Sequence, residues 1–458
     1  MTLWKKLRKR MEQYPLQTVS ELNAVITYEQ LIIFAETYSE KLKDEKCCAI
    51  YCKSEMAAGM ALLACFAANV TAVPLSLRYG EKHCMKIIDA VDPTCIITDH
   101  DGELVINHIK DSNYIPPKCS PALIMFTSGT TGMPKGAMLS SNNIWTNVTD
   151  ISTYFQINKS DTILISRPLY HCAVLTGEFL TSLYNGLNIV MCSESFNPKT
   201  IIDILTDKKI TTFCGTPTLL TMLSNFIRTP KELDLKNIVV SGECMSTESG
   251  LKLKSKFESA KIYHVYGLTE ASPRVSYLPP EKFALTPNSV GIPLKSVQIK
   301  ILTEDGQTVE DGECGILWVK GKNVMVGYYN NPDATRKIFK DGWLCTGDIA
   351  FIKSGLLYIK CRNDDLIIRA GMNIYPQEIE NELKKDSRVD EVVVYGENNQ
   401  KYGTQICLEI VGNFIDENEI RKLCHELLPS FQVPEKIKLV KEIRKNGTGK
   451  VVRKHVRI

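Results

Sequence analysis

Residues 122–136 of this 458-residue chain read ALIMFTSGTTGMPKG. The segment 123–126 is apolar and uncharged, as expected for a buried strand. The segment 127–136 consists mainly of glycine, serine, threonine and proline, and it contains one lysine, Lys135. Glycines let backbone N–H groups approach an anion, hydroxyl groups add hydrogen-bond donors, and the lysine adds positive charge. The stretch therefore predicts a strand that runs into a phosphate-binding loop.

An ordinary solvated turn is the alternative interpretation, because Gly, Ser, Thr and Pro are common turn residues. A turn has no need of so long a run followed by a lysine, so the phosphate loop is favoured. The loop also departs from the common nucleotide-binding pattern, in which Gly-Lys-Ser/Thr opens a helix. Here Pro134 precedes the lysine and Gly136 follows it. We therefore expect the loop to belong to another class of enzyme.

Helical and strand patterns alternate on both sides of the loop. Expected helices are 27–44, 56–68, 81–91, 141–154, 176–185, 201–208, 217–228 and 246–257, and expected strands are 47–52, 71–75, 95–98, 161–167, 188–192, 211–214 and 238–241. Such alternation indicates an α/β fold with a largely parallel sheet. Its two rounds predict a large N-terminal domain of two stacked α/β subdomains.

The uncharged run 56–77 is long enough to cross a membrane as a helix. Asn69, Thr71 and Pro74 interrupt this run, and alanine and glycine outnumber leucine and isoleucine. A buried helix followed by a buried strand is therefore favoured over a spanning segment.

The amino terminus, 1–15, is basic, but no apolar segment follows it as in a secretory signal. An amphipathic helix on a membrane surface is the alternative, and Trp4 and Leu7 are too few apolar anchors for it. The net charge of +3, with 23% charged residues, indicates no nucleic-acid surface. Sixteen scattered cysteines without paired spacing predict reduced, mostly buried thiols in the cytoplasm. We expect no stable membrane anchoring.

From about Ser289 the pattern changes to short strands separated by turn residues, which predicts a small antiparallel β unit such as a barrel. Expected elements beyond it are helices 376–384 and 417–427 and strands 389–395, 405–411 and 437–440. They predict a small α+β domain of its own. We place the boundary so that the two domains are 1–363 and 364–458.

Five segments, taken together, resemble the motifs of the adenylate-forming superfamily of acyl- and aryl-CoA synthetases, luciferases and peptide-synthetase adenylation domains. In chain order they are SGTTGMPKG (128–136), VYGLTEAS (265–272), GWLCTGDIA (342–350), CRNDDLIIRAGMNIYPQEIE (361–380) and NGTGKVVRK (446–454). Any one segment would be a weak signal, but five in the family's order cover nearly the whole chain.

The resemblance implies that a carboxylic acid is joined to AMP from ATP with release of pyrophosphate, and that a thiol then attacks the mixed anhydride. Positive charge and directed donors must therefore face the phosphates. The residues implied to hold the β- and γ-phosphates are Thr127, Ser128, Gly129, Thr130, Thr131, Gly132 and Lys135. Thr269 is implied to donate to the α-phosphate, and Glu270 to ligate Mg²⁺, which prefers carboxylate and phosphate oxygens.

The later motifs complete the implied nucleotide site. Tyr266, beside Gly267, is expected to stack on adenine. Asp348 is expected to accept from both ribose hydroxyls and Arg362 to donate to the same sugar. Lys450 is implied to contact the carboxylate and the α-phosphate as the catalytic lysine. A turn aspartate at Asp348 and a solvated charge at Lys450 are the alternatives.

The resemblance also implies that the small domain is mobile. In the family it carries the lysine, here Lys450, into the site for adenylation and out of it for thioester formation. Asp364 takes the hinge position, and Gly371 faces the thiol channel after rotation. The residue before Arg362 is usually glycine, whereas here it is Cys361. Cysteine does not visit positive φ freely, so we expect either a stiffer hinge or one that turns only at Asp364.

Residues 167–180, RPLYHCAVLTGEFL, resemble the acid-binding region. Amino-acid-activating relatives have an aspartate there for the ammonium group, whereas this chain has His171, so an amino acid is a poor candidate. His171 is expected to close the acid pocket, with a buried core histidine as the alternative. Glu178 could make that pocket polar. The SGECMS segment supplies Gly242 and Glu243, which are expected to line the nucleotide pocket.

The motifs predict an ATP-dependent carboxylic acid:thiol ligase. Only eight residues follow Lys450 and no Gly-x-Asp-Ser attachment site is present, so a separate acceptor is expected. CoA is the first choice, and the phosphopantetheine of a separate carrier protein is the alternative. A non-catalytic nucleotide-binding relative is a remote alternative. Such a protein would have lost key charged residues of the motifs, and those present are Lys135, Glu270, Asp348, Arg362 and Lys450.

Overall fold

The computed structural model describes residues 1–100, 102–127, 134–193, 197–227, 233–369, 372–399, 403–444, 451 and 453. The chain forms two compact units. The first comprises Met1–Lys300, Trp318–Cys345 and Gly355–Leu357, and the second comprises Ile301–Leu317, Thr346–Ser354 and Tyr358–Ile458. Both mix helices with strands, so the predicted α/β class, with a large and a small part, is confirmed.

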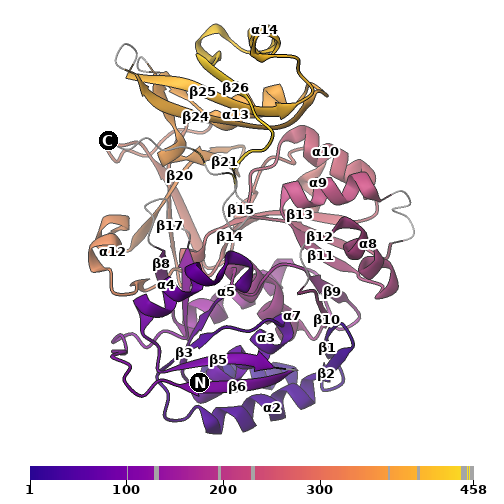
Figure 1. Ribbon diagram of the computed structural model, residues 1–458, viewed down its shortest axis with the longest axis vertical. Helices are drawn as coiled ribbons and strands as arrows, with labels where there is room; N and C mark the ends of the chain where they lie inside the picture. Colours follow the sequence, from indigo (N-terminus) through magenta and orange to yellow (C-terminus); the bar gives the residue numbers. More distant parts are fainter. Residues whose placement is uncertain are drawn as a thin grey trace. The chain divides into compact units, whose positions relative to one another are not determined.

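The first unit contains a seven-stranded sheet, and one of its inner strands precedes the predicted phosphate loop (Figure 1). Its strands in order are β18 (Gly327–Tyr328), β8 (Lys135–Leu139), β7 (Leu123–Thr127), β4 (Thr71–Pro74), β3 (Cys47–Ile50), β5 (Cys95–His100) and β6 (Glu103–His108). The four strands β7, β4, β3 and β5 are parallel, and β8, β18 and β6 are added antiparallel. Parallel strands need cover on both faces, which explains why β3 and β4 are fully buried.

Helices cover the faces of this sheet. Their apolar residues lie on one face in some helices and all round in others. On α4 (Glu81–Val91) the buried side chains Cys84, Ile87, Ile88 and Val91 pack against residues of β3, β4 and β7. The helix α3 (Glu55–Ala68) is apolar on nearly every face and is buried through most of its length, as predicted for the uncharged run. It lies beside α2 (Tyr28–Lys41) in Figure 1. In the described part of the chain, no helix has the length and apolar character needed to cross a bilayer.

A nine-stranded sheet forms the second layer system of this unit. Its order is β15 (Ile292–Pro293), β14 (Arg274–Leu278), β13 (Lys261–Gly267), β12 (Asn237–Val240), β11 (Thr212–Gly215), β9 (Thr162–Ile165), β10 (Asn188–Met191), β1 (Thr18–Glu21) and β2 (Ala24–Thr27). The strands from β13 to β1 are parallel, and β14, β15 and β2 are antiparallel. Its helices are α5 (Ser141–Tyr154), α7 (Thr181–Asn185), α8 (Pro198–Asp207), α9 (Pro217–Phe226), α10 (Thr247–Lys256) and α11 (Pro280–Phe283).

The amino terminus forms α1 (Leu3–Met11), an element that the sequence did not reveal as part of the core. Its buried side chains are Leu3, Trp4, Leu7 and Met11. The helix contacts α7, α3, α2 and α5, so its apolar face is covered by the protein itself. The basic residues lie on the remaining faces.

The predicted β unit after Ser289 is a five-stranded sheet. Its order is β16 (Val297–Leu302), β17 (Gly315–Gly321), β20 (Trp343–Lys353) and β19 (Phe339–Lys340), with β21 (Leu356–Arg362) paired to β20. Between β18 and β19 lies α12 (Pro332–Ile338).

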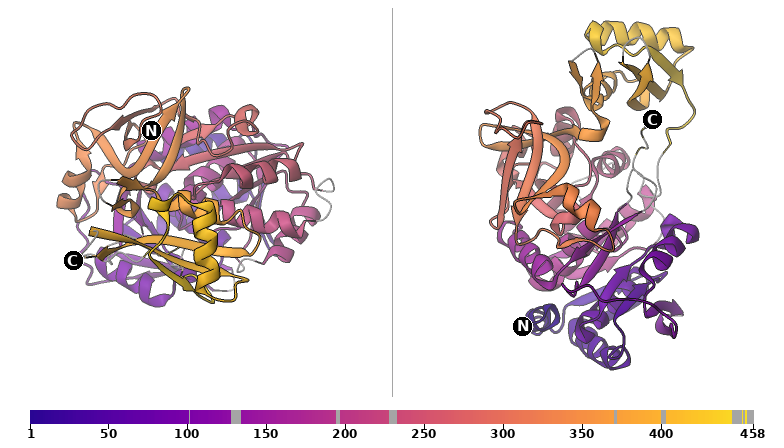
Figure 2. Two further views of the ribbon diagram at one scale, coloured as in Figure 1. Left: turned by 90° about the horizontal axis from the view of Figure 1, so that it is seen from above. Right: turned by 90° about the vertical axis from the view of Figure 1, so that its left-hand side faces the viewer.

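The rest of the second unit is small and has its own core. A three-stranded sheet, β24 (Val389–Asn399), β25 (Gly403–Gly412) and β26 (Lys436–Leu439), is joined by α13 (Pro376–Leu383), α14 (Glu417–Leu427) and the hairpin β22 (Ile367–Arg369) to β23 (Met372–Ile374). The yellow helix α14 runs along this sheet in Figure 2. Buried side chains from all these elements form one cluster, for example Ile379, Leu408 and Ile420.

Three features of the first unit differ from the expectations. Lys135 begins a strand, β8, in a segment where the loop was expected to continue to Gly136 and no strand was expected. The hairpins β1 to β2 and β5 to β6 were not anticipated. The expected helix at 176–185 is divided into a π-helix, Leu175–Leu180, and α7.

Candidate active site

Lys135 lies directly opposite Thr127 where β7 and β8 meet at the phosphate loop. The Thr127 hydroxyl donates to the carbonyl oxygen of Lys135 at 3.4 Å. The Nζ atom of Lys135 lies 5.5 Å from the centre of the Tyr328 ring. Both predicted phosphate-binding residues therefore lie at the carboxyl end of β7, the edge at which open α/β sheets bind ligands.

Glu270, the predicted metal ligand, lies in a 3-10 turn, Thr269–Ala271, shortly after β13. Its carboxylate Oε1 accepts a hydrogen bond of 2.7 Å from the Tyr328 hydroxyl. Its carbonyl oxygen accepts one of 2.8 Å from the Met325 N–H. A carboxylate is the kind of ligand that Mg²⁺ prefers, so the donor type at this turn fits the predicted ion.

Two buried asparagines hold the turn that carries the predicted metal ligand. Asn147 of α5 donates to the Arg274 carbonyl at 2.8 Å and accepts from the Arg274 N–H at 3.1 Å. Asn323 donates to the carbonyls of Ala271 and Arg274 at 2.8 and 3.1 Å. Both asparagines are 0% exposed. Breaking such bonds would leave buried polar groups unpaired at about 1–3 kcal/mol each, so one conformation of the turn is strongly favoured.

Tyr266 and Gly267 end β13, where its register with β14 shifts. A Cβ atom added to Gly267 would lie 2.1 Å from the carbonyl oxygen of Pro273, so a larger residue does not fit. The Leu268 N–H donates to the same carbonyl at 2.9 Å. The Tyr266 ring beside it is half-buried, which is compatible with stacking on a base.

Gly242 and Glu243 follow β12. Gly242 has a φ of 93°, a conformation that glycine adopts without strain. The Glu243 carboxylate accepts from the Thr218 hydroxyl at 2.7 Å and from its N–H at 3.3 Å. Thr218 is in the first turn of α9, where a negative charge is favourable. Glu243 therefore has a helix-capping contact that the sequence did not predict.

In the second unit, the two residues predicted to hold ribose are paired with each other. Arg362 Nη1 donates to Asp348 Oδ1 and to the Thr346 carbonyl, both at 3.1 Å. Asp348 is 6% exposed, and its N–H donates to the Thr346 hydroxyl at 3.1 Å. Gly347, between Thr346 and Asp348, has a φ of 71°. Asp364, the predicted hinge residue, lies in the next turn, Asn363–Asp365.

His171 precedes the short helix α6 (Cys172–Val174) in the predicted acid-binding region. Its ring meets that of Tyr170 edge to face, with centres 5.7 Å apart. Burial raises the pKa of the Cys172 thiol to about 12, and the Glu270 carboxylate adds to this increase. The start of α6 is therefore within electrostatic range of Glu270.

Glu178 brings charge to the same region as a buried ion pair. It lies on the π-helix, a kind of turn that is frequent at functional sites, and it is 2% exposed. Burial raises its pKa, while the paired Arg167 guanidinium and the charge of Arg274 oppose the increase. Among the described residues, no hydrogen-bond partner reaches Glu178 Oε2.

Several predicted site residues lie outside the described part of the chain. They are Ser128, Gly129, Thr130, Thr131, Gly132, Gly371 and Lys450. Their roles stay predictions.

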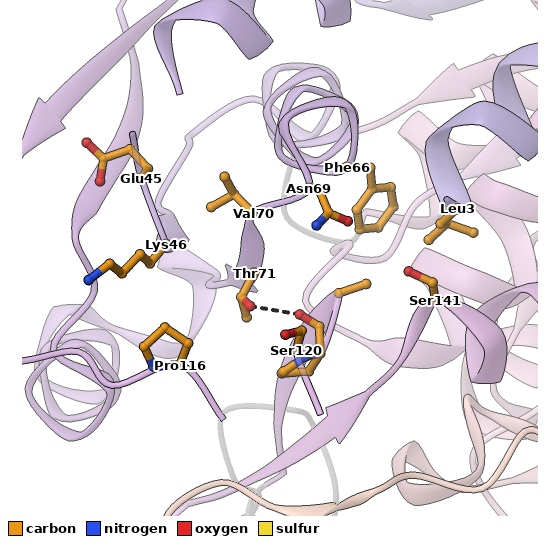
Figure 3. Close-up of a pocket in the computed structure, with 12 residues that line it drawn as sticks. Leu3, Glu45, Lys46, Phe66, Asn69, Val70, Thr71, Pro116, Ser120 and Ser141 are labelled. Atoms are coloured by element: carbon orange, nitrogen blue, oxygen red, sulfur yellow. Dashed lines mark hydrogen bonds between the residues drawn. The ribbon is translucent and has the colours of Figure 1, made fainter. Parts of the chain in front are cut away.

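A cavity of about 210 Å³ lies elsewhere in the first unit (Figure 3). It is lined by Leu3, Glu45, Lys46, Phe66, Asn69, Val70, Thr71, Pro116, Ser120, Pro121, Ala122 and Ser141. Thr71 begins β4 and Ala122 precedes β7, so the cavity lies at the amino ends of these parallel strands. The predicted phosphate loop follows the opposite, carboxyl end of β7. The cavity is therefore separate from the candidate active site.

The chain matches the family model described as AMP-binding enzyme over residues 7–329, and the model described as AMP-binding enzyme C-terminal domain over 378–450. The protein therefore belongs to the AMP-binding enzymes, the adenylate-forming class that its five motifs resemble.

Individual relatives are CoA ligases. The chain is 32% identical to a long-chain-fatty-acid–CoA ligase of Haemophilus influenzae over 76% of this chain and 64% of that protein. It is 30% identical to a 2-succinylbenzoate–CoA ligase of Bacillus cereus over 85% of this chain and 83% of that protein. The o-succinylbenzoate CoA synthetase of Bacillus subtilis, solved with its acyl-adenylate intermediate, is similar in structure, with a TM-score of 0.86, 26% identity, and 99% and 97% of the two chains covered. That synthetase is also known in complex with ATP and magnesium ion.

Sequence reasoning missed Tyr328, Asn147 and Asn323. None lies in the five motifs, and each contacts its partner across a long stretch of chain. A buried-asparagine pattern on α5 was the only signal that could have found one of them, since Asn143 and Asn147 are four residues apart and share a helix face.

Proposed function

We propose that the protein is an ATP-dependent carboxylic acid:thiol ligase that forms an acyl-adenylate and then a thioester. The observation that carries the proposal is the contact of one tyrosine with both Lys135 and Glu270, next to Thr269. A lysine for phosphate, a hydroxyl donor and a carboxylate for a divalent cation are the groups that a triphosphate needs. Membership of the AMP-binding enzymes supports the same function.

In the first step, Lys135 and the loop that precedes it hold the leaving pyrophosphate, and the Thr269 hydroxyl donates to the α-phosphate. Glu270 holds Mg²⁺, which neutralises phosphate charge when it is bound. Preorganised donors of this kind act without reorganising during the reaction, and each contributes about 3–4 kcal/mol. The hydrogen bonds of Asn147 and Asn323 to the turn support these two roles, because they limit movement of Thr269 and Glu270.

In the proposal, residues of the second unit bind the ribose and supply the catalytic lysine. Asp348 accepts from the ribose hydroxyls, and Arg362, which already donates to Asp348 Oδ1, orients the carboxylate. Lys450 contacts the substrate carboxylate and the α-phosphate. We propose residues 364–458 as a mobile domain that turns at Asp364 between the two steps.

The proposed acid is a fatty or aromatic carboxylic acid, because the named relatives act on long-chain fatty acids and 2-succinylbenzoate. His171 closes its pocket. CoA is the proposed acceptor because these relatives are CoA ligases, and a carrier-protein phosphopantetheine is the alternative. Most of the sixteen cysteines are buried, which supports a reducing, cytoplasmic location.

Pyrophosphate exchange into ATP tests the first step. The purified protein is incubated with Mg²⁺, ATP, labelled pyrophosphate and a panel of fatty and aromatic acids. We expect exchange that depends on one class of acid. Absence of exchange with every acid, in protein shown to be folded, contradicts the proposal. Supplying CoA or phosphopantetheinylated carrier proteins to the active combination then distinguishes the two acceptors.

Replacing Lys450 with alanine separates the two steps. We expect exchange to fall about 10²–10³-fold, because a charge aimed at the reacting phosphate is lost. Thioester formation from supplied acyl-AMP should change far less. Lys441→Ala, an exposed lysine of the same unit, serves as the control. Equal losses in the two steps would show that Lys450 does not have this role.

A further inference from the structure

Tyr328 contacts two predicted site residues that are far apart in the sequence. Its hydroxyl donates to Glu270 Oε1 at 2.7 Å, and Lys135 Nζ lies 5.5 Å from its ring centre. The residue is 8% exposed. One buried side chain therefore joins the lysine of the phosphate loop to the predicted metal ligand.

The backbone on both sides of Tyr328 is fixed. The strand β18, which contains it, pairs antiparallel with β8, the strand that Lys135 begins. The Tyr328 N–H donates to the Thr335 hydroxyl at 2.9 Å, and the Tyr329 N–H donates to the Gly136 carbonyl at 2.8 Å. The backbone that carries the phenol is therefore fixed beside the strand that carries the lysine.

The adjacent tyrosine shows what a purely structural role looks like in this chain. Tyr329 stacks on Tyr114, with ring centres 6.0 Å apart, and belongs to the apolar cluster around α4. Its hydroxyl donates to the carbonyl oxygen of Val91 at 3.3 Å. Tyr328 instead places its hydroxyl on a carboxylate and its ring beside an ammonium group.

We infer that Tyr328 is a positioning residue, which orients Glu270 for a divalent cation and keeps Lys135 beside the phosphate loop. The inference rests on the proposed function, because it uses the roles proposed for these two residues. The hydrogen bond to Oε1 restricts rotation of the carboxylate and leaves its second oxygen, Oε2, to ligate the cation. Outer-shell bonds of this kind orient metal ligands, and their loss weakens metal binding about 10–100-fold.

The test compares Tyr328→Phe with the matched variant Tyr329→Phe, because each removes one hydroxyl and keeps its ring. Mn²⁺ is the probe, titrated by electron paramagnetic resonance into the protein with α,β-methylene-ATP. We expect Tyr328→Phe to raise the Kd for Mn²⁺ at least about tenfold, and Tyr329→Phe to change it less than about twofold. The Mg²⁺ concentration that supports half-maximal pyrophosphate exchange should rise in parallel, while the KM for the acid stays constant.

A second background isolates the contact itself. Glu270→Gln keeps an acceptor oxygen for Tyr328 but removes the negative charge, so adding Tyr328→Phe to it should change Mn²⁺ affinity little. Unchanged affinity in Tyr328→Phe, an equal loss in both backgrounds, or the same loss in Tyr329→Phe would each overturn the inference. Weakened Mn²⁺ binding without exchange for any acid would support the inference and contradict the ligase proposal. Pyrophosphate exchange with unaltered metal dependence in Tyr328→Phe would contradict the inference and support the ligase proposal.

Discussion

At the residue scale, Glu55 shows how the fold sets the chemistry of one side chain. It is the first residue of α3, and its carboxylate accepts the Leu169 N–H at 2.9 Å, two residues before His171. Burial raises its pKa to about 7, the Leu169 N–H and Arg78 oppose this increase, and Glu21 adds to it. A carboxyl group that titrates near neutrality therefore holds the backbone at Leu169, in the segment predicted to bind the acid.

Replacing Glu55 with glutamine should stabilise the protein more at pH 8 than at pH 5. An unfolded glutamate titrates near about 4.3, whereas Glu55 in the folded protein titrates near 7. Between these values the folded state binds more protons than the unfolded state, so stability falls as pH rises. Above about pH 7 the cost of the buried charge is complete, at about 3–4 kcal/mol, and glutamine removes it.

Urea unfolding at pH 5 and pH 8 measures this difference. The control is Glu29→Gln, which changes an exposed carboxylate in the first turn of α2. A stabilisation by Glu55→Gln that is the same at both pH values would show that Glu55 is not buried at a cost.

At the element scale, the Arg453 side chain binds residues of α13 and β24. Arg453 Nη2 donates to Glu380 Oε2 at 3.0 Å, and Nη1 donates to Glu380 Oε1 and to the Val394 carbonyl. The Val394 N–H in turn donates to Glu380 Oε1 at 2.7 Å. Arg453 Nε also lies 3.6 Å from Asp365, beside the predicted hinge. A bidentate, nearly buried ion pair therefore fixes the Arg453 side chain.

Arg453→Met should be strongly destabilising, because it leaves the Glu380 carboxylate buried and unpaired. Loss of one partner of a buried pair costs about 3–5 kcal/mol. The control is Arg388→Met, whose side chain is 38% exposed and pairs with Asp386 and Glu419, so a much smaller loss of stability is expected because solvent screens an exposed pair.

Urea unfolding measures both variants of the second unit. Because Lys450 lies three residues before Arg453, the folded fraction of Arg453→Met should also lose more pyrophosphate exchange than thioester formation. Similar costs for the two arginines would contradict a special contribution of the buried pair.

Most elements of the fold could be predicted because their apolar residues repeat with the period of a helix or a strand. The strand β4 and the helix α14 are examples. The strand β8 was missed because Lys135 and Gly136 resemble a loop, and only pairing with β7 makes them extended. The hairpin β1 to β2 was missed because β2 is largely exposed and shows no apolar alternation.

The candidate site could be predicted only where its residues form contiguous motifs. Glu270, Asp348 and Arg362 were predicted in this way, and their roles stay predictions. Tyr328 and Asn147 were not, because their partners lie 58 and 127 residues away and a hydrogen bond at that separation leaves no local pattern. What the sequence does not reveal is therefore the set of contacts that hold the predicted site residues in place.

At the scale of the whole molecule, the two proposed steps make opposite demands. Adenylation needs Lys450 at the α-phosphate, whereas thioester formation needs the thiol to reach the same anhydride. The chain divides into two compact units, and the proposed hinge lies in a turn of the second, Asn363–Asp365. Cys361, where the family usually has glycine, is 3% exposed within β21. A packed side chain at this position leaves Asp364 as the better candidate for the rotation.

Asp364→Pro should therefore impair one step far more than the other. Proline fixes φ near −65°, a value that the observed 3-10 turn accommodates. The turn can therefore form, while rotation about the N–Cα bond of residue 364 is blocked. Asp364→Ala removes the same carboxylate and leaves rotation free, which makes it the matched control. Pyrophosphate exchange measures the first step, and thioester formation from supplied acyl-AMP measures the second. We expect their rates in Asp364→Pro to diverge at least about tenfold, since lid movements of this kind often limit turnover. Equal effects on both steps, or the same divergence in Asp364→Ala, would show that the chain does not turn at this residue.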